Sequence, residues 1–306
     1  MVEVVPAVRR LVPDLLSGPQ PSVACVCTTS PKYLVFDRNP SQPACVVEFA
    51  DVARVSRVQQ ILTTLGGQMA DAVAASLCCT RWQDDTYVHI QSGLPGIPWF
   101  RVADTLATRS DWERFIDRAV ALMIRLHEAT RRVSEWKQVV RPGAELRRQT
   151  AWSLRHSTPL SAAVLHRIAD LTTVLENAGP FDACHQHGDF SVNNLITSGD
   201  TMAIIDFDEF GGTNVPLHDA FGLALSIRLS QAERCPLSLQ ECIARCVEPA
   251  RQDEHVDERS VPGLLMHHLL WRINQCYGVE RRAPLRSILL RWVELLASSP
   301  AAFFDR

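Results

Sequence analysis

The first ninety residues alternate short apolar, β-branched runs with turn signals. The runs are VACVCTT (23–29), YLVFDR (33–38) and ACVVEFA (44–50), separated by SPK and NPSQP. This pattern predicts antiparallel strands joined by hairpin turns. Asp51 then predicts the N-cap of a helix whose apolar residues recur at helical spacing until Gly66 and Gly67 end it. CCTRW and YVHIQS predict two further strands.

From GLPGIP (93–98) onward the pattern becomes mostly helical, and this Gly- and Pro-rich stretch is the predicted hinge. SDWERFIDRAVALMIRLHEAT (110–130) predicts a helix with a Ser N-cap and a Glu three residues later. Further helices are predicted at 143–155, 160–178, 217–230, 238–250, 261–276 and 284–297. The chain is therefore expected to be α+β, with a small antiparallel sheet and one helix in residues 1–95 and a larger helical part in residues 96–306.

One stretch in the helical part breaks the pattern. NLIT, SGD and TMAIIDF (194–207) read as strand, tight turn and strand. Residues that flank such a turn come back beside each other, so we expect Asp206 to lie next to Asn194.

Composition and charge narrow the classes of partner. The 306 residues carry a formal net charge of −3 with a pI near 6.4, and no block of like charges, which argues against nucleic acid. The N-terminus lacks the pattern of a signal peptide, and no apolar run approaches the roughly 20 residues of a membrane helix. Ten cysteines occur without a CxxC pair, and Cys242 and Cys246 alone do not make a metal site. We therefore expect free thiols in a cytoplasmic protein, without a membrane partner.

Two polar segments carry the candidate chemistry, HGDFSVNN (187–194) and IIDFD (204–208). Phosphoryl transfer needs a carboxylate that accepts the proton of the attacking hydroxyl and hard oxygen ligands for magnesium. Asp189 is the candidate base, and Asn194 and Asp206 are candidate ligands of one metal. Asp208, two residues further along an expected extended stretch, should face the same side and assist a second metal.

These segments resemble the aminoglycoside phosphotransferase and choline kinase group of the protein-kinase-like fold, in which HGDxxxxN precedes a hairpin and an acidic IDF segment. IRLHEAT (124–130) is similar to a helix of that family, and VPLHDAFGLAL (215–225) resembles the segment whose aspartate, here Asp219, braces the catalytic loop. The resemblance implies a bilobal fold with a nucleotide-side N-lobe (1–95) and a C-lobe (96–306) that holds the catalytic loop and the substrate.

The resemblance also implies roles for single residues. It implies ATP or GTP as donor, magnesium (Mg2+) as cofactor, and a small-molecule hydroxyl as acceptor, such as an aminoglycoside-like compound or another natural product. The backbone of Gln91, Ser92 and Gly93 would meet the nucleotide base. His187 belongs to the catalytic loop, where we expect it to position the loop rather than carry a proton. His127 and His218 are expected to be helix residues with local hydrogen bonds.

The sequence departs from that family where a lysine should contact the nucleotide phosphates. Glu48 occupies this position, and Val58, Gln59 or Gln60 stands where the partner glutamate is expected. Exchanging attraction for repulsion about 4 Å from a phosphate would disfavour binding by several kcal/mol. One hypothesis is that Lys32, in the glycine-free SPK turn, takes over the phosphate contact while Glu48 pairs with Arg54 or Arg57. The alternative is that Lys32 is a solvated turn residue.

Three functions remain open. The leading one is a small-molecule phosphotransferase. The second is a catalytically impaired, pseudokinase-like binding protein that lost nucleotide binding through Glu48. The third, a metal-dependent HD-type phosphohydrolase using His185, His187 and the His218–Asp219 pair, conflicts with the β-rich first part. Acceptor and oligomeric state are not determined: the acidic residues of RQDEHVDERS (251–260), namely Asp253, Glu254, Asp257 and Glu258, fit either a polycation site or a solvated loop.

Overall fold

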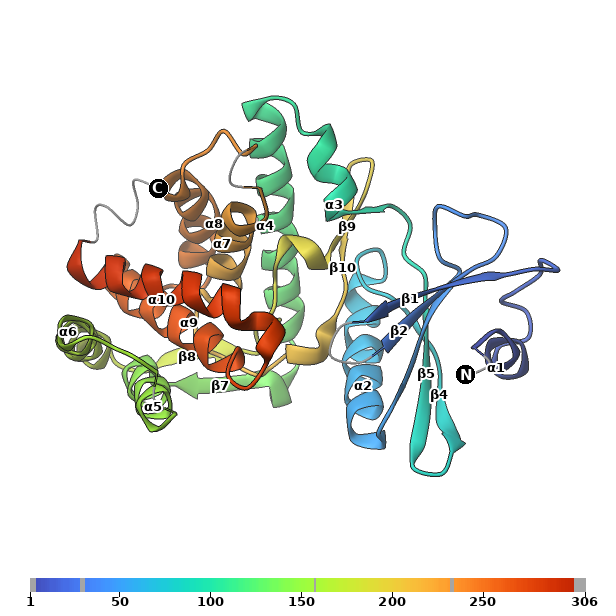
Figure 1. Cartoon of the computed structure of the whole chain (residues 1–306), viewed down its shortest axis with the longest axis horizontal. Coiled ribbons are helices and arrows are strands. Elements are labelled where there is room, and N and C mark those ends of the chain that lie inside the picture. Colours follow the sequence, from blue (N-terminus) through green and yellow to red (C-terminus); the bar gives the residue numbers. More distant parts are fainter. Residues whose placement is uncertain (1–3, 28–30, 157, 232–233, 300–306) are drawn as a thin grey trace. The chain divides into compact units, whose positions relative to one another are not determined.

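The structure is a computed structural model that describes residues 4–27, 31–156, 158–231 and 234–299. It contains two compact units: an N-terminal unit of Met1–Thr105 and Asn193–Asp208, and a C-terminal unit of Leu106–Val192 and Glu209–Arg306 (Figure 1). The N-terminal unit thus extends beyond the predicted boundary at residue 95 and also takes in the 193–208 segment. Which part binds nucleotide and which binds acceptor stays a prediction.

The N-terminal unit is built on a five-stranded antiparallel sheet in the order β1-β2-β3-β5-β4. Its strands are β1 (Ser22–Cys27), β2 (Pro31–Phe36), β3 (Cys45–Ala50), β4 (Ser76–Gln83) and β5 (Thr86–Ser92). The predicted hairpins are confirmed, because β1, β2 and β3 pair antiparallel in chain order. The last two residues of the predicted first strand, 28 and 29, lie outside the described residues.

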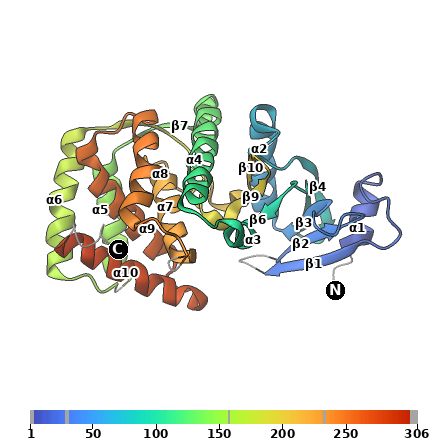
Figure 2. The ribbon, with the colours of Figure 1, turned by 90° about the horizontal axis from the view of Figure 1, so that it is seen from above.

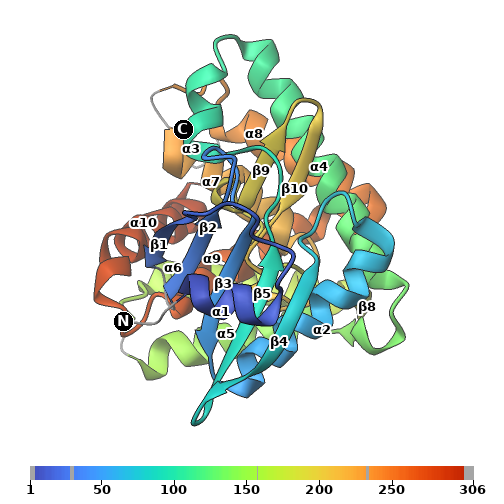
Figure 3. The same cartoon turned by 90° about the vertical axis from the view of Figure 1, so that its right-hand side faces the viewer.

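A short helix, α1 (Val4–Leu11), covers one face of the sheet and was not expected from the sequence (Figure 3). Val4 and Val8 of this helix pack with Val35, Val47 and Ile90 of the sheet. Since side chains alternate along a strand, the neighbours of Val47 on β3, including Glu48, point to the opposite face. That alternation keeps Glu48 away from the apolar cluster under α1.

The predicted helix after the third strand is α2 (Val52–Met69), and its Asp51 cap is confirmed, because the Asp51 side chain accepts the N–H of Arg54. The predicted end at Gly66 and Gly67 is wrong. A glycine inside a helix costs about 1 kcal/mol relative to alanine. Burial of Met69 in the next turn of the helix outweighs that local cost, so α2 runs past both glycines.

The C-terminal unit is mainly helical (Figure 2). Its helices are α4 (Arg109–Arg131), α5 (Pro142–Arg155), α6 (Ala162–Ala178), α7 (His218–Gln231), α8 (Leu239–Asp253), α9 (Val261–Gln275) and α10 (Ala283–Ser298), in agreement with the predicted helices. The predicted Ser N-cap of α4 is wrong: Thr108 caps the helix and forms a capping box with Asp111. Two strands that were not predicted, β7 (Lys137–Val140) and β8 (Phe181–Cys184), pair antiparallel, and β8 leads directly into the HGDFSVNN segment.

The predicted strand-turn-strand is confirmed as β9 (Leu195–Ser198) and β10 (Thr201–Ile204). β6 (Ile97–Pro98) pairs with β9 and continues into the short helix α3 (Trp99–Val102). Ile204 also donates its N–H to Ala72 O at 2.8 Å, which ties the hairpin to the segment after α2. Within the described ranges, no helix combines the length and apolar character needed to cross a bilayer.

Candidate functional site

The segment that carries Asp189 is held by the carboxylate of Asp219 at the start of α7. Asp219 accepts the backbone N–H of His187 at 2.7 Å and that of Gly188 at 3.0 Å. Gly188 has φ +83°, and a Cβ there would lie 2.4 Å from Glu209 O, so the turn requires glycine. The expected brace between Asp219 and the loop is therefore present as two hydrogen bonds.

Asp219 is itself paired with His127 of α4, which lies between two carboxylates. The His127 Nε2 is 3.0 Å from Asp219 Oδ2, and its Nδ1 is 3.1 Å from Glu254 Oε1. Burial alone would lower the pKa of His127, but the hydrogen bonds and charges of Asp219 and Glu254 outweigh burial and raise this pKa to about 10. His127 is therefore a buried imidazolium that neutralises the carboxylate holding the loop.

This cluster corrects two predictions. The hydrogen bonds of His127 are not local. One partner, Asp219, lies 92 residues further along the chain, and the other, Glu254, is the C-cap of α8. Nor is the acidic run a solvated loop throughout: Glu254 is almost completely buried and also accepts the N–H of Leu217 at 2.8 Å. Periodicity identified the helices but could not identify partners so far apart in the chain.

His218, next to Asp219, makes a second long-range contact. Its Nε2 lies 3.3 Å from Gly188 O, which again differs from the predicted local hydrogen bond. Burial lowers the pKa of His218 to about 4, so the ring is neutral at pH 7 and its Nε2–H can donate to that carbonyl. His187 is fully buried, with its ring edge-on to Phe190. Its predicted positioning role fits this placement and stays a prediction.

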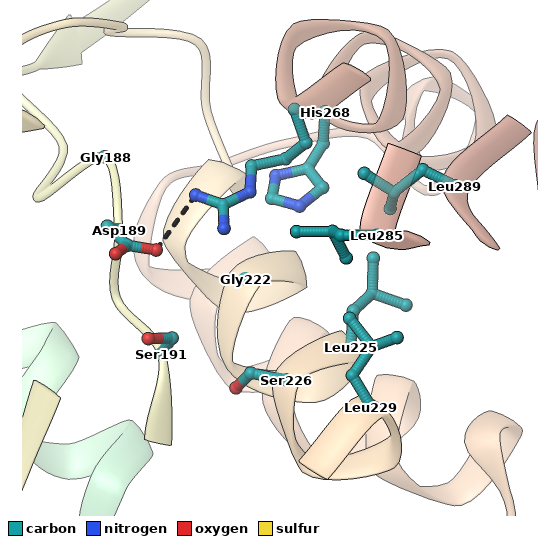
Figure 4. Close-up of a pocket in the computed structure, with 11 residues that line it drawn as sticks. Gly188, Asp189, Ser191, Gly222, Leu225, Ser226, Leu229, His268, Leu285 and Leu289 are labelled. Carbon is teal, nitrogen blue, oxygen red and sulfur yellow. Dashed lines mark hydrogen bonds and ion pairs between the residues drawn. The ribbon is translucent and has the colours of Figure 1, made fainter. Parts of the chain in front are cut away.

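Asp189, the candidate base, forms an ion pair that the sequence did not reveal. Its Oδ1 accepts a hydrogen bond from Arg272 Nη1 at 2.9 Å, the dashed line of Figure 4. Both side chains are about one-third exposed. The available sequence signal was Arg272 itself, the single arginine of α9. Asp189 and Arg272 line a pocket of about 40 Å³ together with Ser191, His268 and leucines of α7 and α10.

The predicted metal ligands lie in the N-terminal unit. Asn194 ends a short 3₁₀ helix, Val192–Asn194, and its carbonyl accepts the N–H of Ile205 at 3.0 Å, so the backbones come together as predicted. Asp206 has φ +68° and is followed by the 3₁₀ helix Phe207–Glu209. The segment is therefore not extended, and the reason given for Asp208 facing the same side as Asp206 is wrong.

The carboxylates of Asp206 and Asp208 nevertheless meet at one cation, Lys32. Lys32 Nζ lies 2.6 Å from Asp206 Oδ1 and 3.2 Å from Asp208 Oδ2. Lys32 is the second residue of β2, not a turn residue, and its side chain is only 17% exposed. Burial lowers its pKa, but the charges of Asp206 and Asp208 outweigh burial and raise it. The interpretation of Lys32 as a solvated turn residue is therefore wrong.

Glu48 and Arg54 extend this network. Glu48 lies opposite Lys32 in the β2–β3 register and is 1% exposed. Arg54 Nε is 2.8 Å from Glu48 Oε1, and Arg54 Nη2 is 2.5 Å from Asp208 Oδ2. The predicted pairing of Glu48 with Arg54 is confirmed. The charges alternate along the network, so Glu48 has a cationic partner, Arg54, at the position where the family's lysine is expected.

The acidic pair fits a divalent cation. Two carboxylates that converge on the Lys32 ammonium present hard oxygen donors to one positive centre, and magnesium prefers such donors. No group of three or more His, Cys, Asp or Glu in the described parts of the chain could hold a metal ion. A magnesium ion at Asp206 and Asp208 would thus draw further ligands from Asn194, from water or from phosphate oxygens.

The predicted base-contacting residues end β5. Ser92 N donates to Ala75 O at 2.8 Å, and Gly93 N donates to Ala44 O at 3.0 Å. A Cβ at Gly93 would lie 1.6 Å from Pro43 O, so only glycine allows this close approach. Gln91 Nε2 is 3.3 Å from His89 Nδ1. Because both backbone donors are used inside the unit, contact with a nucleotide base at Gln91, Ser92 and Gly93 stays a prediction that would rely on carbonyl oxygens.

Comparison with known proteins agrees with this geometry. Residues 27–254 match the model of the phosphotransferase enzyme family, APH. Glucosamine kinase with glucosamine, ADP and phosphate superposes with a TM-score of 0.63 at 14% identity, covering 92% of this chain and 81% of that one. A thermostable APH(4)-Ia mutant with ADP and hygromycin B gives 0.63 at 11%, covering 98% and 99%. APH(2")-IIIa with GDP and kanamycin gives 0.60 at 14%, covering 97% and 98%.

At these identities the solved structures establish the fold alone, and they confirm the predicted α+β, protein-kinase-like fold of the aminoglycoside phosphotransferase group. No curated protein matches this chain. An entirely helical HD-type fold is excluded by the five-stranded sheet.

Proposed function

Because the chain belongs to the phosphotransferase enzyme family and is a kinase-like phosphotransferase for small molecules, we propose that it moves the γ-phosphoryl group of ATP or GTP to an acceptor hydroxyl. The solved structures that share its fold hold ADP or GDP, which supports a nucleotide donor of either kind. The observation that carries the proposal is the convergence of Asp206, Asp208 and Lys32 in one charge cluster of the N-terminal unit.

Asp189 is the proposed base. The acceptor oxygen bonds to the γ-phosphorus while the bond from that phosphorus to the β–γ bridging oxygen breaks, and the nucleoside diphosphate leaves. The proton of the acceptor hydroxyl passes to the Asp189 carboxylate. Asp219 and Gly188 hold the loop for this step, since the hydrogen bonds and the left-handed turn described above determine the path of the backbone up to Asp189.

Asp206, Asp208 and Asn194 are the proposed magnesium ligands. When bound, magnesium neutralises charge on the donor phosphates. The pKa of Asp208 is raised to about 6, chiefly by burial and also by the charge of Asp206, while Lys32 and Arg54 oppose the rise. The positive charge of Lys32 and Arg54 next to Asp208 therefore favours its ionised form.

Lys32 is the proposed replacement for the missing phosphate-contacting lysine. It stands one strand away from the expected position and directly opposite Glu48 in the sheet register. The neighbouring Arg54 pairs with Glu48 and cancels its charge, so that a phosphate would meet Lys32 without an unpaired carboxylate beside it. The departure at Glu48 is thus compatible with nucleotide use.

The same contacts favour a second candidate, a pseudokinase-like binding protein. Lys32 and Arg54 together form ion pairs with Asp206 and Asp208. A cluster neutralised in this way could stabilise the fold rather than bind a nucleotide. The cytoplasmic location stays a proposal as well.

Thermal unfolding with ATP or GTP, each with and without Mg2+, separates the two candidates. A nucleotide at 100 times its Kd should stabilise the folded protein by about 2.7 kcal/mol. Lys32→Ala should reduce this stabilisation, whereas Lys137→Ala, which removes the chain's other lysine from an exposed position on β7, should not. Lack of stabilisation by either nucleotide would favour the binding protein. Glu48→Lys is a poor test, because it buries a third cation beside Lys32 and Arg54.

Turnover provides the second test. Asp189→Asn should keep nucleotide binding and lower the rate of phosphoryl transfer by at least about 100-fold, the contribution typical of a general base. Unchanged turnover in this variant would remove Asp189 from the proposed role.

A further inference from the structure

We propose that the acceptor is an aliphatic compound with an anionic group, such as a carboxylate, close to the hydroxyl that is phosphorylated, and that Arg272 binds this group. The inference rests on the proposed function, because it takes Asp189 as the base. It follows from a pocket inside the C-terminal unit, where the catalytic loop meets α7, α9 and α10 (Figure 4).

Arg272 stands where an acceptor must approach. Its Nη1 is 2.9 Å from Asp189 Oδ1, and the two side chains form one wall of the pocket. A guanidinium is planar and carries five N–H donors, so it can contact Asp189 and a second carboxylate at once. A hydroxyl placed on Asp189 would bring a neighbouring anionic group against Arg272.

The remaining charges do not suit a polycation. His268 lines the pocket, but burial together with the neighbouring positive groups holds its pKa well below the ordinary value, so its ring is neutral. Asp189 is balanced by Arg272, and an ammonium group on the acceptor would lie beside that guanidinium. The pocket therefore repels an amine where it attracts a carboxylate.

Three of the four acidic residues of the run that could have received a polycation contact partners in their own unit. Asp253 pairs with Arg131 at 2.8 Å, and Glu254 pairs with the buried His127 at 3.1 Å. Asp257 accepts the N–H of Arg259 as the cap of a 3₁₀ helix. These contacts do not involve the pocket, and they also argue against a polycationic acceptor.

The opposite wall is apolar. Leu225 and Leu289 are each 2% exposed, and Leu229 and Leu285 continue the surface. The volume of about 40 Å³ admits part of a molecule rather than a set of sugar rings. An alkyl chain fits this wall, since it loses no hydrogen bonds to water on entering.

Three matched probes test the acceptor class: 3-hydroxyoctanoate, its uncharged methyl ester, and 1-aminooctan-3-ol, in which a protonated aminomethyl group replaces the carboxylate. Phosphorylation of each, and of kanamycin, is measured with Mg2+ and ATP or GTP, alongside nucleotide binding in their absence. We expect kcat/KM for the carboxylate to exceed that for the ester by about 10- to 100-fold, the range of a charge-assisted hydrogen bond. The amine and kanamycin should be poorer than the ester.

Variants of Arg272 identify the contact. Arg272→Gln should lower kcat/KM for 3-hydroxyoctanoate about 10- to 100-fold more than it lowers the value for the ester, mainly through KM, because the loss of the contact with Asp189 affects both substrates. Arg272→Lys should restore part of the preference. Arg282→Gln is the control, because Arg282 is half-buried, donates to Gln275 O and does not line the pocket.

The outcomes distinguish failure of the proposed function from failure of the inference about the acceptor. If neither ATP nor GTP binds, the proposed function fails. If a nucleotide binds but the ester, the amine or kanamycin is used as well as 3-hydroxyoctanoate, or no probe is used, the anionic-acceptor inference is overturned while the proposed function stands. Equal losses for carboxylate and ester in Arg272→Gln also overturn it, because they would show that Arg272 only positions Asp189.

Discussion

Replacing His127 by glutamine tests the buried cluster that holds the loop with Asp189. His127 lies between Asp219 and Glu254, whose side chains are 0% and 7% exposed. The substitution removes the cation and leaves two buried carboxylates, and breaking a buried ion pair in this way costs about 3–5 kcal/mol. We therefore expect His127→Gln to lower the thermal midpoint by roughly 10 °C, since 1 kcal/mol corresponds to about 2–4 °C in a protein of this size class.

The pKa of His127 gives the sign of a pH dependence. Because the folded-state pKa is raised to about 10 from the ordinary 6.5, the stabilisation is complete below about pH 6.5 and is lost as the pH rises through about 10. Each pKa unit corresponds to about 1.4 kcal/mol, so this histidine should contribute about 4 kcal/mol at pH 7 and about 1.5 kcal/mol at pH 9. The wild type should lose roughly 2–3 kcal/mol from this group between the two values.

Urea unfolding followed by far-ultraviolet circular dichroism at pH 7 and pH 9 measures this loss. Other groups also titrate in this range, so the quantity that matters is the difference between the wild type and His127→Gln, which should shrink by roughly 2–3 kcal/mol from pH 7 to pH 9. His166→Gln is the matched control, because His166 is an exposed residue of α6. A difference that stays constant between the two pH values would refute a raised pKa at His127.

Two further pairs of substitutions test the local geometry. Gly188→Ala should destabilise the fold by roughly 2–4 kcal/mol in thermal unfolding, because φ is +83° and the new Cβ would lie 2.4 Å from Glu209 O. Gly67→Ala should instead stabilise the fold by about 0.5–1 kcal/mol in the same assay, because Gly67 lies inside α2 and its new Cβ would have open space within 4 Å. Thr108→Ala should cost about 1 kcal/mol through loss of the α4 capping box, whereas Ser110→Ala should stay within about 0.5 kcal/mol; equal midpoints for these two would contradict the assigned cap.

The order of the helices and strands could be read from the sequence because it depends on neighbours in the chain. Apolar spacing located the seven long helices of the C-terminal unit, and turn residues located the hairpins of the sheet. Where local signals competed, tertiary packing decided. Gly66 and Gly67 indicated a helix end, yet α2 continues past them because Met69 is buried. The helix α1 was not predicted, because its short apolar face is stabilised only by packing against the sheet.

The candidate site divides in the same way. Asp189, Asn194 and Asp206 could be found from spacing alone, because the loop and the hairpin that present them are continuous in sequence. The pairing of Glu48 with Arg54 could also be predicted, since Glu48 lies on β3 and Arg54 in the first turn of the helix that follows it. Their roles in binding and catalysis stay proposals.

What the sequence by itself determined is therefore the seven long helices of the C-terminal unit, most strands of the sheet, and the loop and hairpin of the 187–208 segment, because each depends on residues a few positions apart. Only the tertiary structure decided which distant group pairs with each charged side chain. It brought Lys32 to Asp206 and Asp208 across more than 170 positions, His127 to Asp219 across 92, and Arg272 to Asp189 across 83. The physical reason is that a charge withdrawn from water needs a partner, and that partner is chosen by proximity in the fold, which short-range sequence patterns do not specify.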